Sequence, residues 1–171
     1  MAFDVPAVAI VGRSNSGKTT LLESLIPLLQ ARGYRVAAVK HYVHPGIEFD
    51  VPGKDSYRLA HAGADRVVLA TPDRVVHVRR CEREPTLAEV VAEIRDVDLV
   101  LIEGHKQAVV PKIEVNRRER DAHLVCGDDA QLIGVVSDQR FDVDVPQFDL
   151  DDVAGVADLL ERRVLAAGRT D

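Results

Sequence analysis

The sequence has few cysteines, no long apolar run, no surplus of positive charge and no basic N-terminal flank. Its two cysteines, Cys81 and Cys126, lie far apart and match neither a metal-ligand spacing nor a disulfide framework, so we expect a protein of the reducing cytoplasm. The longest apolar runs are far shorter than the roughly 20 residues that span a bilayer. The first residues, MAFDVPAVAIVG, include Asp4 and no basic residue, unlike a secretory signal peptide.

The net charge limits the class of binding partner, and the chain length limits the number of domains. The chain carries 22 Lys and Arg against 28 Asp and Glu, a formal net charge of -6. This balance argues against nucleic acid or an anionic membrane as the main partner. The length of 171 residues, with 46% hydrophobic and 29% charged residues, is that of one globular domain, which buries about 70% of its unfolded surface. We therefore expect a single domain over residues 1–171.

Short apolar runs alternate with amphipathic stretches along the chain. This alternation predicts an α/β fold: one three-layer domain with a mainly parallel β-sheet. The segment 112–116 alternates between apolar and polar residues and is predicted as a half-buried strand. Strands are expected at 5–11, 34–39, 65–70, 74–78, 98–103, 112–116 and 131–136. Helices are expected from residue 18 to before Gly33, at 55–61, from the capping box at 86–89 to residue 94, and at 151–165.

One motif between the first strand and the first helix carries specific chemistry. Residues 12–19 read G-x-x-x-x-G-K-T, the P-loop pattern. Its backbone N–H groups and the positive end of the following helix cradle phosphates. Lys18 is expected to reach the β- and γ-phosphate oxygens and Thr19 to ligate Mg²⁺, which favours a P-loop fold over a plain Gly/Ser turn. The predicted nucleotide ligands are Gly12, Arg13, Ser14, Asn15, Ser16, Gly17, Lys18, Thr19 and Thr20, with Thr20 on the α-phosphate.

A P-loop enzyme also needs an acid near its Mg²⁺. Asp98 begins a predicted strand and Glu103 ends it, and ligands gather at the carboxyl ends of parallel strands, so Glu103 is the better candidate. Asp55 follows a long loop and could contact Mg²⁺ or position the attacking water, or be a helix N-terminal charge. The predicted catalytic residues are therefore Lys18, Asp55 and Glu103, and the predicted metal ligands Thr19, Glu103 and Asp55.

Three further features can each be interpreted as functional or as purely structural. His41 and His44 have H-x-x-H spacing without an apparent further ligand, so loop histidines are favoured over a metal site. Asp138 follows a late strand, where an Asp could accept hydrogen bonds from guanine or form a turn. The charged segment 117–121 is expected to be a solvated loop, with a lid or a partner contact as the alternative.

Six segments together resemble the molybdopterin-guanine dinucleotide biosynthesis protein B (MobB) family. The resemblance covers roughly residues 5–140, and PGKDSYR with EGHK and KIE is more specific than the P-loop. The segments, in order, are GRSNSGKTT, Lys40-His41, PGKDSYR (52–58), AGAD (62–65), LIEGHK (101–106) and PKIEVNR (111–117). Two departures stand out: His105, where the family usually has Phe, and few histidines after His41, which weakens a histidine metal site.

The resemblance implies a GTP-binding protein of the signal-recognition-particle-like P-loop class. Such proteins are homodimers with weak GTPase activity that assist the nucleotidyltransferase MobA in attaching GMP to molybdopterin. The implied ligands are GTP and Mg²⁺, with molybdopterin as a further candidate, and Lys54, Asp55 and Glu103 would line the Mg²⁺ and switch region. Two alternatives stay open: an adapter whose loop 41–54 is ordered by nucleotide without significant hydrolysis, and a small-molecule P-loop kinase with 117–120 as its arginine-rich lid.

Overall fold

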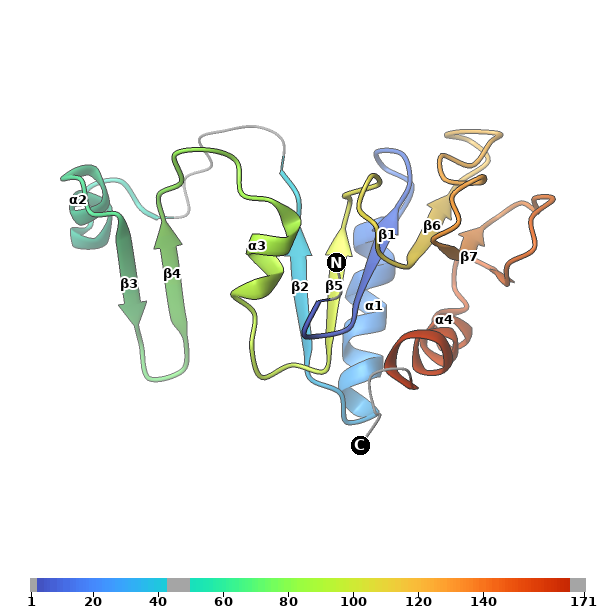
Figure 1. Cartoon of the computed structure of the whole chain (residues 1–171), viewed down its shortest axis with the longest axis horizontal. Helices are drawn as coiled ribbons and strands as arrows, with labels where there is room; N and C mark the ends of the chain where they lie inside the picture. The colour runs from blue at the N-terminus through green and yellow to red at the C-terminus, as the bar shows by residue number, and fades with distance from the viewer. Residues whose placement is uncertain (1–2, 43–49, 167–171) are drawn as a thin grey trace. The chain divides into compact units, whose positions relative to one another are not determined.

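The P-loop strand lies inside a sheet whose six strands are all parallel. The computed structural model describes residues 3–42 and 50–166. The strand order is β2-β5-β1-β6-β7-β8. Strands β5 and β6 therefore flank β1, as Figure 1 shows. This arrangement confirms the predicted mainly parallel α/β sheet. The strands are β1 (Ala7–Val11), β2 (Val36–Lys40), β5 (Leu99–Glu103), β6 (Lys112–Asn116), β7 (Leu132–Ser137) and β8 (Gln147–Phe148), the last of which the sequence did not predict.

Strand β1 is buried on both faces because its side chains alternate between two hydrophobic clusters. Val8 and Ile10 pack in the cluster formed with helices α1 (Lys18–Ala31) and α4 (Val153–Leu160). Ala7, Ala9 and Val11 pack on the opposite face, in a cluster that includes Val91 of α3 (Leu87–Ala92). The sheet therefore lies between two apolar layers, which is the predicted three-layer arrangement.

The helices follow the sequence signals with two differences. Helix α1 ends before Gly33, whose φ of 91° is in the left-handed region that favours glycine. Helix α4 begins after Asp152, whose carboxylate accepts a hydrogen bond from the Gly155 N–H at 2.9 Å. The predicted helix at 151–165 continues as a π-helical turn, η1 (Glu161–Leu165). Helix α3 ends at Ala92, two residues before the predicted end.

The prediction of a half-buried strand at 112–116 is wrong. All five residues of β6 are buried, including the polar Lys112, Glu114 and Asn116. Lys112 forms an ion pair with Asp129 at 2.6 Å. Glu114 accepts the backbone N–H groups of residues 125 and 126, at 2.7 and 2.8 Å. Asn116 donates to the carbonyl oxygen of residue 123 at 3.0 Å. The polar face of β6 is therefore covered by the segment 117–131, which it holds through hydrogen bonds.

The chain divides into two compact units, residues 1–41 with 87–171 and residues 42–86. The second unit contains α2 (Asp55–His61) and a two-stranded antiparallel sheet of β3 (Arg66–Ala70) and β4 (Val75–Arg79). These three elements confirm the predicted helix and the two predicted strands. The P-loop and the parallel sheet belong to the first unit, and a single domain over residues 1–171 stays a prediction. Within the described ranges, none of the helices has the length and apolar character needed to cross a bilayer.

Candidate functional site

The P-loop joins the end of β1 to the start of α1 through two glycines with positive φ. Gly12 has a φ of 134° and Gly17 a φ of 102°. A Cβ on Gly12 would overlap the carbonyl oxygen of Val115 in β6, so the loop passes where only glycine fits. The loop ends at α1, whose first-turn N–H groups have no partner within the helix. The geometry thus provides the phosphate cradle that the motif predicts.

Lys18 is folded back over this loop. Its Nζ donates to the carbonyl oxygens of Gly12 at 3.1 Å and Arg13 at 2.7 Å. The pKa of Lys18 is lowered, mainly because its ammonium group is partly buried. The charge of Glu103 opposes this shift, whereas the charge of Lys40 adds to it. A compact ammonium held at the opening of a phosphate cradle is suited to bind the β- and γ-phosphate oxygens.

Glu103 meets the P-loop at the carboxyl end of the neighbouring strand. The Thr19 hydroxyl donates to Glu103 Oε2 at 2.9 Å, and Lys40 Nζ lies 2.8 Å from Glu103 Oε1. Lys40 and Glu103 are paired residues of β2 and β5, which accounts for this contact. Burial alone would raise the pKa of Glu103, but the hydrogen bonds from Lys40 and Thr19 and the charges of Lys40 and Lys18 outweigh it and lower this pKa. The carboxylate is thus held ionised.

The Thr19 hydroxyl and the Glu103 carboxylate fit a magnesium ion. Both are hard oxygen donors, and Mg²⁺ in nucleotide sites is held by one or two protein oxygens together with phosphate oxygens and water. In the described part of the chain, no group of three or more His, Cys, Asp and Glu side chains could hold a metal ion. A metal at this edge therefore needs ligands from a bound phosphate.

The segment 117–121 is a loop, as predicted, but it is not simply solvated. The partly buried Arg117 donates from Nε to the carbonyl oxygen of Ser16 at 3.2 Å. The Asp121 carboxylate accepts the backbone N–H of His123 at 3.0 Å and forms an ion pair with Arg13 at 2.7 Å, and these two contacts lower the pKa of Asp121. The loop is thereby attached to the P-loop at two points.

Asp138 lies at the end of β7, beside the same loop. Its side chain is exposed, and Oδ1 accepts the backbone N–H of Arg118 at 2.8 Å. Because Arg117 contacts Ser16, adjacent residues of one loop connect Asp138 to the P-loop. The structure therefore places Asp138 on the β6 side of the phosphate cradle, while its guanine-reading role stays a prediction.

Among the residues that the structure describes, the remaining candidates do not line the cavity at the P-loop. Asp55 begins α2 in the second unit, where its carboxylate is 95% exposed and 3.5 Å from Arg58, and its role toward Mg²⁺ stays a prediction. His41 packs its ring 4.2 Å from the ring of His105. His44 lies outside the described residues. Asp98, at the opposite end of β5 from Glu103, pairs with Arg35 at 3.1 Å.

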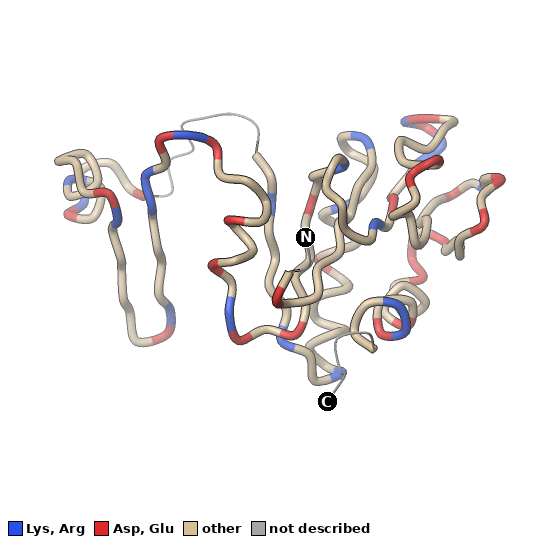
Figure 2. Tube along the Cα trace, viewed as in Figure 1, with Lys and Arg blue, Asp and Glu red and all other residues tan. Residues whose placement is uncertain are grey.

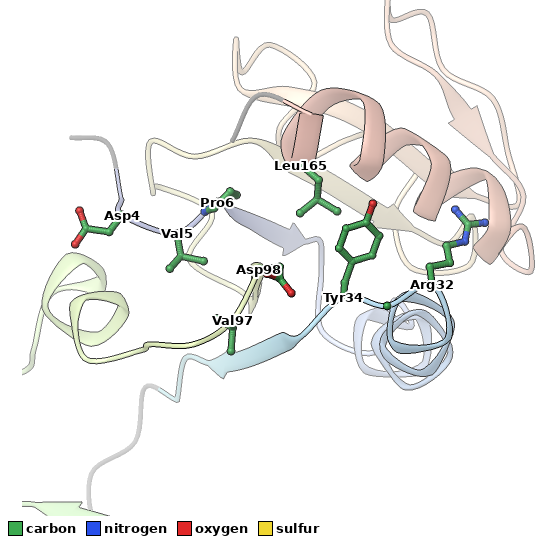
Figure 3. A pocket seen from close by; sticks show the side chains of 9 residues that line it. Asp4, Val5, Pro6, Arg32, Tyr34, Val97, Asp98 and Leu165 are labelled. Atoms are coloured by element: carbon green, nitrogen blue, oxygen red, sulfur yellow. The ribbon is translucent and has the colours of Figure 1, made fainter. Parts of the chain in front are cut away.

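Two cavities lie at opposite ends of the parallel strands. One, of about 570 Å³, is lined by P-loop residues together with Lys40, Glu103, Arg117 and Glu119. Another, of about 510 Å³, is lined by Asp4, Val5, Pro6, Arg32, Gly33, Tyr34, Val97, Asp98 and Leu165, and the residues before β1, β2 and β5 place it at the amino ends of the strands (Figure 3). Open α/β sheets bind ligands at the carboxyl ends, which makes the P-loop cavity the candidate site.

Sequence reasoning did not assign two residues of this site. Lys40 appeared only within a family motif, although it is one of only five lysines in the chain and ends a strand. Arg117 was assigned to a charged loop, and no local pattern reveals its contact with Ser16, 101 positions earlier. Both contacts depend on the strand order, which brings the ends of β2, β5, β1 and β6 together.

Comparison with known proteins decides the family. The family model described as "Molybdopterin guanine dinucleotide synthesis protein B" matches residues 7–138, from β1 to Asp138. The chain belongs to the MobB family. The match includes the P-loop, Glu103 and the loop 117–121, so the site described above lies within the family's shared region.

Curated MobB relatives cover nearly the whole chain. The molybdopterin-guanine dinucleotide biosynthesis adapter protein of Haemophilus influenzae is 37% identical over 164 residues, which cover 94% of this chain and 90% of the relative. The Escherichia coli protein of the same name is 38% identical over 163 residues, covering 91% of each chain.

Solved MobB structures share the fold. A crystal structure titled as molybdopterin-guanine biosynthesis protein B superposes with a TM-score of 0.73 at 31% identity, over 91% of this chain and 98% of that chain. The crystal structure of Bacillus subtilis MobB superposes with a TM-score of 0.69 at 26% identity, over 93% of this chain and 98% of that chain. The P-loop α/β fold predicted from the sequence is thus confirmed.

Proposed function

We propose that the chain is a GTP-binding adapter, with weak GTPase activity, in the attachment of GMP to molybdopterin. The observation that carries the nucleotide part is the contact of Thr19 with Glu103 beside a P-loop built around Gly12. The pathway part is supported by family membership and by the curated relatives, which are named adapter proteins of molybdopterin-guanine dinucleotide biosynthesis.

The residues have distinct tasks in this proposal. The N–H groups of the P-loop bind the β-phosphate, Lys18 binds the β- and γ-phosphate oxygens and Thr20 binds the α-phosphate. Thr19 and Glu103 hold Mg²⁺, which neutralises charge that develops on the phosphates. Hydrolysis is slow because positioning and charge alone assist the attacking water, with Asp55 as the candidate residue to orient it.

Guanine selectivity rests on Asp138 in this proposal. Its Oδ1 accepts from Arg118, while its second carboxylate oxygen has the chemistry to accept from a guanine N–H. Calorimetry of GTP and ATP binding with Mg²⁺, on the wild type and on Asp138→Ala, tests this assignment. We expect a preference for GTP that the variant loses.

Each other outcome has a defined meaning. A GTP preference that survives in Asp138→Ala contradicts the role of Asp138 alone. Equal or tighter ATP binding contradicts the GTP-binding function and favours a kinase or an ATPase. Single-turnover hydrolysis of GTP with and without the partner enzyme then separates a weak GTPase from an adapter that nucleotide merely switches.

The partner in this proposal is the nucleotidyltransferase MobA, in the cytoplasm, with molybdopterin as a further ligand of the complex. Lys and Arg are interspersed with Asp and Glu along the described trace rather than gathered on one element (Figure 2). The net charge is -6. Because neither the distribution of charges nor the net charge is that of a basic surface, both features support a protein or a small molecule, rather than nucleic acid, as the binding partner.

A homodimer is the proposed assembly, and the second unit supports it. Val67 is the one buried residue among 50–86, and an isolated two-stranded hairpin is marginally stable at best. Val68 and Val75, on the face of the hairpin opposite Val67, are 54% and 56% exposed. A second copy of the chain that covers these valines would supply the missing apolar burial.

A further inference from the structure

Arg117 presents an unpaired guanidinium to the P-loop cavity. Its side chain is partly buried and lines that cavity with P-loop residues. Its Nε and Nη2 lie 3.5 Å from the position that a Cβ on Gly17 would occupy. Among the residues that the structure describes, Arg117 pairs with no carboxylate, whereas Arg13, Arg32 and Arg140 each contact one at 2.7 Å.

The acidic residues of its own loop are engaged by other arginines. Asp121 pairs with Arg13 at 2.7 Å, and Glu119 is 3.6 Å from Arg120. Within residues 3–42 and 50–166, the guanidinium of Arg117 makes one hydrogen bond, from Nε to the Ser16 carbonyl oxygen at 3.2 Å, which uses one of its five donors. The remaining four N–H donors are available to an anion beside Gly17. A guanidinium fork of this kind matches the geometry of phosphate oxygens.

The strand order places this arginine relative to the other parts of the site. Glu103, on β5, lies on one side of β1, and Arg117, after β6, lies on the other. Asp138 follows β7, the next strand beyond β6. A nucleotide with its γ-phosphate and metal at Glu103 and its base at Asp138 has its α-phosphate between them, on the Arg117 side.

We propose that Arg117 binds the α-phosphate of the bound nucleotide, on the side of the P-loop opposite the metal ligands. This inference rests on the proposed nucleotide-binding function. The hydrogen bond to Ser16 fixes the guanidinium before the ligand arrives, so little side-chain entropy is lost on binding. Arg117 thus supplements the Thr20 contact to the same phosphate.

The experiment compares GTP and GDP binding to Arg117→Gln. Both nucleotides carry the α-phosphate, so the variant should raise the Kd of GTP and of GDP by the same factor, about tenfold to a hundredfold for a charge-assisted contact. Arg120→Gln is the matched control, because it removes the same charge from the same loop at an exposed position, and its Kd values should stay at wild-type levels. Arg117→Lys, which keeps the charge but loses the planar fork, should give intermediate Kd values for both nucleotides.

Other results would overturn the inference. A Kd for GDP equal to that of the wild type, with GTP weakened, would place Arg117 on the γ-phosphate. Wild-type affinity for both nucleotides in Arg117→Gln and Arg117→Lys would reduce Arg117 to a support of the loop. Circular dichroism checks folding, and if Arg117→Gln fails to fold, the GTP-to-GDP comparison in Arg117→Lys decides between these outcomes. If the wild type binds neither nucleotide, the proposed function fails and this inference with it.

Discussion

Gly12 lies where β1 turns into the P-loop, directly against the backbone of β6. At a φ of 134° and with the Val115 carbonyl in the place of a Cβ, an alanine must move one of two buried strands. We expect Gly12→Ala to lower the free energy of unfolding by about 1–3 kcal/mol, as overpacking does, and to abolish GTP binding because the cradle shifts. Urea unfolding and calorimetry measure the two effects.

Gly33→Ala provides the control for this prediction. Gly33 also has positive φ, at 91°, but nothing lies within 4 Å of its added Cβ. The variant should lose about 1 kcal/mol from the strained backbone and bind GTP as the wild type does. Loss of binding in both variants would mean that general destabilisation, rather than the P-loop contact, is responsible.

Glu114 is a fully buried carboxyl group and should make stability depend on pH. Burial raises the pKa of Glu114, and the N–H groups of Val125 and Cys126 only partly oppose this shift. A raised pKa in the folded state means that the folded protein binds the proton more tightly than the unfolded chain. The stabilising contribution is therefore present below the unfolded pKa of about 4.3 and is lost as the pH rises through the folded value.

Urea unfolding across this pH range tests the prediction. The free energy of unfolding of the wild type, relative to that of Glu114→Gln, should fall as the pH increases from about 4. The glutamine variant is the reference because it cannot titrate at this position. A difference that is constant with pH, or that grows with pH, would contradict a raised pKa.

At the scale of elements, β5 carries one carboxylate at each end of a buried apolar strand. Glu103 contacts Thr19 of the P-loop, and Asp98 contacts Arg35 at the other end. Glu103→Gln should remove most of the gain in GTP affinity that Mg²⁺ provides, about tenfold or more, because a metal ligand is lost. Asp98→Asn should leave this gain unchanged. Calorimetry with Mg²⁺ and with EDTA measures it, and equal effects of the two variants would contradict a metal role for Glu103.

Most elements could be predicted because their signals are local. The P-loop motif, the apolar run of β5 and the caps of the helices each lie within a few residues, and the structure confirms the elements that they predict. Glu103 was expected near Thr19 because parallel strands end at one edge, and the structure places them 2.9 Å apart. The two-residue β8 has no periodicity from which to predict it.

The features that were missed depend on contacts between distant segments. An alternating strand is half-buried only if one face meets water, and β6 instead meets the segment 117–131, which no pattern in KIEVN reveals. The contacts of Lys40 and Arg117 likewise follow from the strand order rather than from their neighbours in sequence. Asp55 was included among the metal ligands because it follows a long loop, and its role toward Mg²⁺ stays a prediction.

At the scale of the whole molecule, the hairpin of β3 and β4, with its exposed Val68 and Val75, should control the formation of the homodimer. Val68→Asp places a charge on the exposed face of β3, and burying that charge in a dimer interface costs free energy unless it is paired. We expect the dissociation constant of the homodimer to rise more than about tenfold. Light scattering after size-exclusion chromatography gives the molar mass against concentration.

Val109→Asp is the matched control, because Val109 is 76% exposed and lies in the other unit. It should leave the molar mass at that of the wild type. Val75→Asp tests the same hairpin face from β4, in case Val68→Asp fails to fold. A wild type that is monomeric at every concentration would contradict the proposed dimer, and a dimer that persists in both hairpin variants would place its interface elsewhere.

The buried polar face of β6 has a consequence for protein engineering. A redesign that maximised apolar contact would replace the buried Lys112, Glu114 and Asn116 by aliphatic residues. The same exchange would remove the side chains that hold the segment 117–131, and with it the fixed position of Arg117. It would also leave the N–H groups of Val125 and Cys126 without their carboxylate acceptor, and buried donors that lose their acceptor cost free energy. Substitutions for heat resistance at β6 would therefore weaken the scaffold and loosen the ligand site together, which makes this strand a poor target for such engineering.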